Sequence, residues 1–345
     1  MGSVKDLEVL MKPTKDKTGI GRFHFSDKYS VFDWGEMPDL IENKGSVLCM
    51  MGAYFFERLG EKGIRTHYRG VIQDGKLVHM DELKAPTSTM EISLVRVFHP
   101  HRSAGKLAYD YGVFSPNLAN FLIPLEIIYR NGLPKGSSVF ERLNAGLKPE
   151  DLGLSYPPRP GDKLKKPVFD VSTKLEERDR YVTWVEAQEL AGLSDGEVGE
   201  IKNILLHIND LITETASKAG LENEDGKVEF GFDPHRKPMV VDVVGTLDEC
   251  RFTHEGIHVS KEIARQYYRE TSWYKDVERA KKEAGIKGIK EWKVLCESKP
   301  PKLDPNLRKF ISEMYMAAAN EFTGIHLFEV PRLAEILDNL AYYPP

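Results

Sequence analysis

The sequence has few cysteines and no long apolar run, and each absence excludes a class of protein. Cys49, Cys250 and Cys296 lie far apart in a chain of 345 residues and form no C-x-x-C pair, which argues against a disulfide framework or a cysteine zinc site. The longest nearly apolar run, at 47–56, has about ten residues, whereas a membrane-spanning helix needs roughly twenty. We therefore expect a protein of a reducing compartment with no membrane partner.

The sequence also lacks the signals expected for export and for nucleic-acid binding. Lys5, Asp6 and Glu8 fall where a signal peptide would need an apolar core. The 48 basic and 53 acidic residues give a net charge of −5, so a polyanion such as DNA is not an expected partner. A local basic pocket for a small phosphate remains compatible with these numbers. The expected location is the cytoplasm.

Hydrophobic patterning predicts an α+β fold, because strands and helices are mixed without regular βαβ alternation. The predicted strands are at 23–26, 64–73, 91–99, 121–129, 227–232 and 239–244. The predicted helices are at 46–59, 194–220, 260–271, 274–284, 305–322 and 331–340. The lysine-rich stretch 1–20 and the proline-rich stretch 147–167 are predicted to be loops.

One predicted hairpin carries a pair of acids. Alternation places Lys227 and Glu229 on one face of the first strand, and a turn centred between residues 235 and 236 places Glu229 opposite Asp242 and Lys227 opposite Val244. Like charges opposite each other destabilise a sheet, and an unpaired carboxylate among valines is costly. Mg²⁺ would relieve both costs, since it binds carboxylates together with phosphate oxygens. The alternative is an exposed hairpin with two unrelated acids.

Other segments carry weaker signals. Residues 26–33 form a dense polar turn after a strand, and Arg130 precedes a helix start at 136–138 that could bind a phosphate through free N–H groups. The alternatives are a plain turn at 26–33 and a plain helix cap at 136–138. His254-Glu255-Gly-Ile-His258 matches the H-E-x-x-H motif of zinc hydrolases. A zinc hydrolase is an alternative function, although Gly256 and the preceding strand make a poor context for the required helix.

Taken together, these segments resemble the SAICAR synthetase (phosphoribosylaminoimidazole-succinocarboxamide synthase) family. The motifs that carry the resemblance occur in order along most of the chain: F-S-D-K-Y-S-V-F-D at 25–33, N-K-G at 43–45, G-I-R-T-H at 63–67, I-P-L-E-I-I-Y-R-N at 123–131 with G-S at 136–137, S-T-K at 172–174, and D-G-K-V-E-F-G at 225–231. Further matches are Asp242, Asp248 with Arg251, residues 300–303, Tyr315 and residues 322–324.

The resemblance implies an ATP-dependent ligase of de novo purine biosynthesis. Such an enzyme joins the carboxylate of CAIR to the amine of L-aspartate through an acyl phosphate, with ATP and Mg²⁺, and releases SAICAR, ADP and phosphate. The implied fold has two ATP-binding lobes, similar to those of kinases and ATP-grasp enzymes, and a helical C-terminal part. The implied regions are an ATP-binding lobe at 1–119, a substrate and metal lobe at 120–259 and helices at 260–345.

The resemblance also implies roles for individual residues. The implied metal ligands are Glu229 and Asp242, and the lysines near the transferring phosphoryl group are Lys227 and Lys174. The implied substrate-binding residues are Ser30, Asp33, Arg130, Ser137, Asp248 and Arg251. The implied nucleotide-binding residues are the adenine hinge Asn120, Phe121 and Leu122, with Lys15 and Lys17 in place of the family's G-K-x-K loop.

Because that N-terminal loop departs from the family pattern, a non-catalytic nucleotide-binding relative is a further alternative. The expected partners are the small molecules CAIR, L-aspartate and ATP, and self-association into a homo-oligomer is left open.

Overall fold

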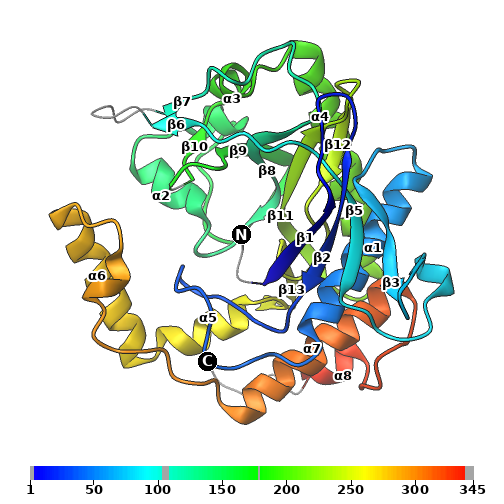
Figure 1. Cartoon of the computed structure of the whole chain (residues 1–345). Helices are drawn as coiled ribbons and strands as arrows, with labels where there is room; N and C mark the ends of the chain where they lie inside the picture. The colour runs from blue at the N-terminus through cyan, green and yellow to red at the C-terminus, as the bar shows by residue number, and fades with distance from the viewer. Residues whose placement is uncertain (1–3, 103–108, 178, 339–345) are drawn as a thin grey trace.

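Two antiparallel sheets form the centre of the molecule, a computed structural model that describes residues 4–102, 109–177 and 179–338 (Figure 1). The first sheet has the strand order β1-β2-β5-β3-β4. Its strands are β1 (Lys5–Met11), β2 (Gly19–Phe25), β5 (Thr89–Leu94), β3 (Tyr68–Gln73) and β4 (Lys76–Val78).

The second sheet has the order β10-β9-β8-β11-β13-β14, and β12 pairs with β11 beside this path. Its strands are β8 (Phe121–Leu133), β9 (Asp162–Thr173), β10 (Tyr181–Val182), β11 (Glu222–Phe232), β12 (Pro238–Val241), β13 (Cys250–His254) and β14 (Ile257–His258). A separate hairpin joins β6 (His101–Arg102) to β7 (Tyr109–Asp110). Bridges from Thr66 to Val240 and from Arg96 to Phe121 link the two large sheets.

Helices cover these sheets and bury their apolar residues against them. The helix α1 (Lys44–Glu61) packs on the first sheet and on α7 (Pro305–Thr323), which also contacts α8 (Leu333–Asp338). The apolar residues of α4 (Asp195–Lys218) recur every three or four positions and are buried, with Ser194 as its N-cap. The remaining helical elements are α2 (Ser138–Asn144), α3 (Trp184–Ala191), α5 (Glu262–Arg269), α6 (Ser272–Lys287) and the 3₁₀ turns η1 (Met80–Glu82), η2 (Pro149–Leu152) and η3 (Trp292–Leu295).

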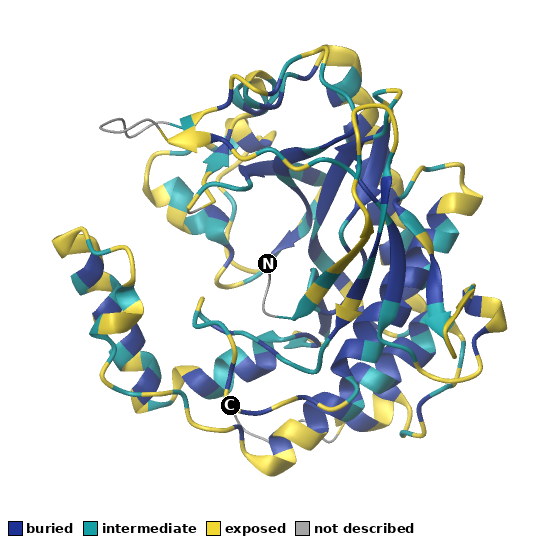
Figure 2. Cartoon of the chain, in the orientation of Figure 1, coloured by how far each residue is buried: buried dark blue, intermediate teal, exposed yellow. Residues whose placement is uncertain are grey.

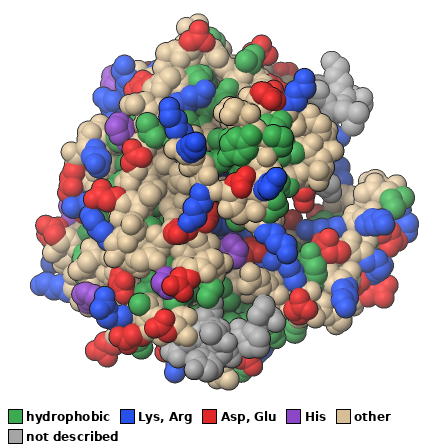
Figure 3. Space-filling view, turned by 180° about the vertical axis from the view of Figure 1, so that it is seen from behind, with side chains coloured by type: hydrophobic (Ala, Val, Ile, Leu, Met, Phe, Trp, Pro, Cys, Tyr) green, Lys and Arg blue, Asp and Glu red, His purple; other side chains and the backbone are tan. Residues whose placement is uncertain are grey.

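Burial is concentrated between the sheets and their helices, as the dark interior of Figure 2 shows. The helix α6 projects from the rest of the molecule as an arm with alternating buried and exposed residues, and Trp273 and Val277 in its first half belong to the buried core. Seen from behind, the surface mixes acidic and basic side chains, and it is hollowed beside that arm (Figure 3). Within the described ranges, no helix is long and apolar enough to cross a membrane.

The predicted α+β class is confirmed, but two predicted loops contain strands. The strand β1 lies within 1–20, where alternating polar residues and a dense lysine content hid an edge strand. The strand β9 begins at Asp162, inside the stretch predicted as a loop, because only its second half is buried and apolar. The predicted strand at 91–99 ends earlier, at Leu94.

The predicted register of the acidic hairpin is wrong by one residue. Glu229 pairs with Val241, because the connection at 233–237 has an odd number of residues and centres the hairpin on His235. Asp242 lies just beyond β12 with a left-handed φ of 64°. Lys227 pairs with Ile128 of β8, and its backbone N–H donates to the carbonyl of Glu249 at 3.1 Å.

Candidate active site

Alternating acids and lysines line one face of the second sheet. Glu126 of β8 and Glu229 of β11 are directly paired in register. The ammonium of Lys227 lies 3.0 Å from Glu126, and Lys174, just beyond the end of β9, lies 3.3 Å from Glu126 and 2.5 Å from Glu229. Burial disfavours charge on both lysines, but the surrounding carboxylates outweigh it and raise the pKa of each. Both lysines are therefore cationic at neutral pH.

Glu229 and Asp242 remain electrostatic neighbours despite the register difference. Burial and then the charge of Asp242 raise the pKa of Glu229 to about 8. Burial also opposes the charge of Asp242, but Lys5, whose ammonium lies 2.6 Å away, lowers the pKa of that carboxyl below its ordinary value. Two buried carboxylates whose charges repel each other are the environment that a divalent cation stabilises.

The donor set suits a cation that takes its remaining ligands from phosphate and water. Across the described residues, no group of three or more His, Cys, Asp or Glu side chains could hold a metal ion. A site built from Glu229 and Asp242 alone fits Mg²⁺, which is commonly held by one or two carboxylates plus substrate phosphates. The ammonium groups of Lys5 and Lys174 lie beside Asp242 and Glu229, next to the place where such a cation would bind.

A cavity of about 530 Å³ opens beside this face of the sheet. Five predicted site residues line it: Asp33, Arg130, Lys227, Asp248 and Arg251. The cavity is also lined by charged residues to which no role was assigned from the sequence: Glu126, Asp179, Asp225, Glu249, Lys261, Glu262 and Arg265. The cavity therefore mixes cations that can bind phosphate or carboxylate with acids that can accept hydrogen bonds.

The two arginines of the cavity share one carboxylate. Arg251 donates its Nε to Asp225 at 2.7 Å and makes a second contact through Nη2, while Arg130 reaches the same carboxylate at 3.3 Å. Arg130 is almost fully buried and also pairs with Asp170 at 3.1 Å. Most of the Arg130 donors are thus used inside the protein. Arg251 is the more exposed of the two and is better placed to contact an anionic ligand.

Asp248 ties the cavity to two helices. Its carboxylate accepts from the Lys44 ammonium of α1 at 2.7 Å and from the Tyr315 hydroxyl of α7 at 2.8 Å. Lys261 donates to the Asp248 carbonyl at 2.7 Å. Burial alone would raise the pKa of Asp248, but the charges of Lys44 and Lys261 lower it to about 2. Asp248 is ionised throughout the neutral range.

Two predicted substrate residues are placed differently. Ser30 and Ser137 are not among the residues that line the described cavity. Ser137 is the buried N-cap of α2 and accepts the Val139 N–H. The neighbouring hydroxyl of Ser138, which was given no role from the sequence, accepts from Arg130 at 3.4 Å.

The two groups predicted to bind nucleotide lie together. The Asn120 side chain donates to the carbonyls of Thr14 at 2.6 Å and Lys17 at 2.8 Å, which anchors the β1–β2 loop to the start of β8. Lys15 and Lys17 are exposed in that loop. The next two residues, Phe121 and Leu122, begin β8, with Phe121 fully buried and Leu122 only partly so. Their contact with adenine stays a prediction.

The H-E-x-x-H segment forms a β-hairpin, which excludes the geometry of a zinc-hydrolase helix. His254 ends β13 and pairs with Ile257 of β14. Glu255 and Gly256 form the turn with φ values of 49° and 81°. The two histidines of the motif therefore do not lie one helical turn apart on a shared face.

Strand periodicity predicts the position of Glu126, one of the lining residues to which no role was assigned from the sequence. Glu126, Ile128 and Arg130 of β8 alternate along the strand and line the cavity together. Lys261 and Arg265 lie near the start of α5. This helix has only eight residues, so the sequence offers no comparable periodic pattern there.

Comparison with known proteins identifies the family of this chain. A family model described as SAICAR synthetase matches residues 13–284. A relative from Archaeoglobus fulgidus is 48% identical over 341 residues, which cover 99% of this chain and 98% of its own. The phosphoribosylaminoimidazole-succinocarboxamide synthase of Thermoplasma acidophilum is 33% identical over 310 residues, which cover 88% of this chain and 92% of its own.

Solved structures share the fold. The structure described as SAICAR-synthase from Saccharomyces cerevisiae complexed SAICAR has a TM-score of 0.62 at 20% identity, and the match covers 94% of this chain and 93% of that one. A SAICAR synthetase in complex with ADP has a TM-score of 0.55 at 21% identity, with 88% and 99% covered.

The fold and the matched relatives place the chain among the ATP-dependent carbon–nitrogen ligases. The chain belongs to the SAICAR synthetase family. The predicted family and its activity in purine biosynthesis, phosphoribosylaminoimidazole-succinocarboxamide synthase (EC 6.3.2.6), are confirmed.

Proposed function

We propose that the cavity beside Glu229 and Asp242 is where the carboxylate of CAIR is activated by ATP and joined to the amine of L-aspartate. One observation carries this assignment. The buried acids Glu229 and Asp242, together with Lys174 and Lys227, lie next to a charged cavity that Arg251 lines. A carboxylate is a poor electrophile until it is phosphorylated, and phosphoryl transfer depends on positioning and charge neutralisation more than on a protein nucleophile.

The chain's own residues divide this work. Lys174 and Lys227 place two cationic ammonium groups where charge develops on the transferring phosphoryl group. Arg251 holds the phosphate or carboxylate of CAIR while Asp225 fixes the plane of its guanidinium. Mg²⁺ held by Glu229 and Asp242 would neutralise the phosphates of ATP. The acyl phosphate would have to be protected from water until the amine attacks.

Nucleotide binding is assigned to the β1–β2 loop and the start of β8. Asn120 ties this loop to β8, so Lys15 and Lys17 are presented beside the strand on which adenine would stack. The related SAICAR synthetase structure in complex with ADP supports nucleotide binding by this fold. We also propose a cytoplasmic location, because the reaction uses soluble nucleotides.

One assay separates the ligase from a non-catalytic relative. The full chain is incubated with CAIR, L-aspartate, ATP and Mg²⁺, and SAICAR and ADP are measured together. Equal amounts of both products support the ligase. ATP binding without SAICAR, from protein that unfolds cooperatively, would identify a non-catalytic nucleotide-binding relative.

The hairpin geometry predicts that Glu255→Gln leaves SAICAR formation unchanged, within about twofold. Glu255 is an exposed turn residue and is not among the lining residues of the described cavity. The measurement is kcat and KM with and without a zinc-selective chelator, in excess Mg²⁺. Loss of more than about 90% of activity, from either the substitution or the chelator, would restore the zinc interpretation.

A further inference from the structure

The loop that carries Asp33 adopts a conformation that its own sequence does not favour. Phe32 and Asp33 have consecutive left-handed φ values of 55° and 59°. Such values are costly for a residue with a bulky side chain, and they persist only where surrounding contacts enforce them. Asp33 lines the substrate cavity, so whatever enforces this loop also places a cavity carboxylate.

Aromatic side chains of the projecting arm enforce it. The Phe32 ring lies 4.6 Å from the ring of Tyr274 and 6.2 Å from that of Trp273, centroid to centroid, and both partners belong to α6. Trp34 lies 5.4 Å from Trp273 and 5.9 Å from Trp292 of η3. The loop is therefore held on both sides of Asp33 by rings from α6 and η3.

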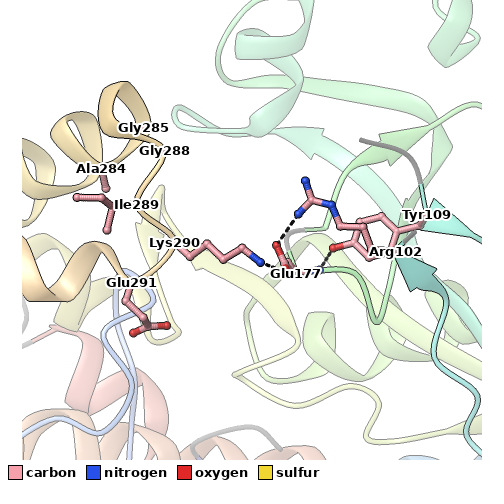
Figure 4. Close-up of a pocket in the computed structure, with 9 residues that line it drawn as sticks. All are labelled: Arg102, Tyr109, Glu177, Ala284, Gly285, Gly288, Ile289, Lys290 and Glu291. Atoms are coloured by element: carbon pink, nitrogen blue, oxygen red, sulfur yellow. Dashed lines mark hydrogen bonds and ion pairs between the residues drawn. The ribbon is translucent and has the colours of Figure 1, made fainter. Parts of the chain in front are cut away.

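Polar contacts from the arm reach the same loop and its neighbour. The Lys281 ammonium of α6 lies 3.0 Å from the Asp33 carboxylate and 5.1 Å from the centre of the Trp292 ring. Between α6 and η3, Lys290 lies 2.6 Å from Glu177, which also pairs with Arg102 at 3.1 Å (Figure 4). Glu177 follows Lys174 by three residues, so the arm touches a second loop of the site.

The arm is itself braced, so it can act as a rigid support. Arg279 of α6 donates to the Leu295 carbonyl of η3 at 2.8 Å, and Asp276 accepts from the backbone N–H and hydroxyl of Ser298 at 2.7 and 2.8 Å. At the foot of the arm, the Tyr29 and Tyr268 hydroxyls lie 2.8 Å apart. The Tyr29 contact ties the beginning of the loop to α5, and the Trp34 ring ties its end to Trp273 and Trp292.

We propose that α6 and η3 are a positioning element of the ligase: Tyr274 and Trp292 hold Phe32 and Trp34 so that Asp33 faces the cavity and accepts a hydrogen bond from an N–H or O–H group of the substrate. Tyr274 and Trp292 act through the loop and do not themselves line the described cavity. This inference rests on the proposed function, because it deepens the role of the same cavity.

The test compares Tyr274→Leu with Tyr274→Phe in the full chain. Leucine removes the ring that packs on Phe32, whereas phenylalanine keeps it. Tyr274→Leu should raise KM for CAIR or L-aspartate by about tenfold, with kcat changed by less than about twofold, and Tyr274→Phe should restore the wild-type KM. Lys287→Ala is the matched control, because its ion pair with Glu283 stays within α6.

A double-substitution cycle identifies Asp33 as the group that the arm positions. Asp33→Asn should raise the same KM as Tyr274→Leu, and combining them should add little, because both remove one interaction with the substrate. Two outcomes would overturn the proposal: a KM for Tyr274→Leu within twofold of wild type for both substrates, or fully additive effects in the double variant.

Fluorescence keeps this test independent of catalysis. Of the four tryptophans in the sequence, Trp34, Trp273 and Trp292 belong to the cluster that holds the loop. In a Trp184→Phe background, titration with CAIR and, separately, with L-aspartate should change the emission of these three, with the affinity for one of the two substrates about tenfold weaker after Tyr274→Leu. Unchanged affinity for both substrates would refute the positioning role. Absence of SAICAR from a wild-type chain that still binds CAIR would instead refute the proposed function.

Discussion

Glu229→Gln should lower kcat for SAICAR formation by about a thousandfold or more, and Asp242→Asn should have a similar effect. Each substitution removes one of two carboxylates that would hold Mg²⁺ against the ATP phosphates, and the charge stabilisation supplied there is worth several kcal/mol. A loss of about 4 kcal/mol corresponds to roughly a thousandfold in rate. The measurement is kcat at saturating ATP, over a range of Mg²⁺ concentrations.

The fold should survive Glu229→Gln. Burial and the neighbouring charge raise the pKa of Glu229 to about 8, so the metal-free protein already tolerates an uncharged group at this position near neutral pH. Glu222→Gln is the matched control on β11, where the exposed carboxylate pairs only with Lys163 among the described ion pairs. More than about a tenth of the wild-type kcat in Glu229→Gln, at any Mg²⁺ concentration, would refute the metal role.

Sequence periodicity identified the acidic hairpin but could not determine its register. Alternation correctly places Lys227 and Glu229 on the face that Glu126 shares. The position of Asp242 depends on the number of residues in the connecting loop and on the left-handed backbone conformation of Asp242 itself. Neither follows from the hydrophobic pattern. The acid pair survives this difference because Asp242 leaves the strand before alternation would direct its side chain to the opposite face.

Motifs predicted the reaction more fully than they predicted the contacts. Arg130 was expected to grip a substrate anion, yet its guanidinium is enclosed by Asp170 and Asp225, which lie on two neighbouring strands. Such a network depends on pairing between strands that are distant in sequence, so a linear motif does not reveal it. Similarly, the support of Asp33 by α6 joins segments about 240 residues apart.

Lys44→Met should be the most destabilising of the substitutions considered, because it leaves the Asp248 carboxylate buried without its main cation. The Lys44 side chain is fully buried, and its ammonium lies 2.7 Å from Asp248. Removing one partner of a buried pair typically costs about 3–5 kcal/mol, whereas an exposed pair contributes about 1 kcal/mol or less. The measurement is the free energy of unfolding in urea, with Lys309→Ala on α7 as the control, since Lys309 and Glu313 form an exposed pair.

The same network predicts an acid-dependent loss of stability. The ordinary pKa of Asp248 is 3.8 and the folded-state pKa is about 2, so its ionised form stabilises the native state fully above pH 3.8. That contribution, about 2 kcal/mol, should disappear as the pH falls from about 4 to 2. The difference in unfolding free energy between wild type and Asp248→Asn should therefore shrink over this range. A constant difference between pH 5 and pH 2 would show that the stabilisation comes from packing around Tyr315 and not from the charge of Asp248.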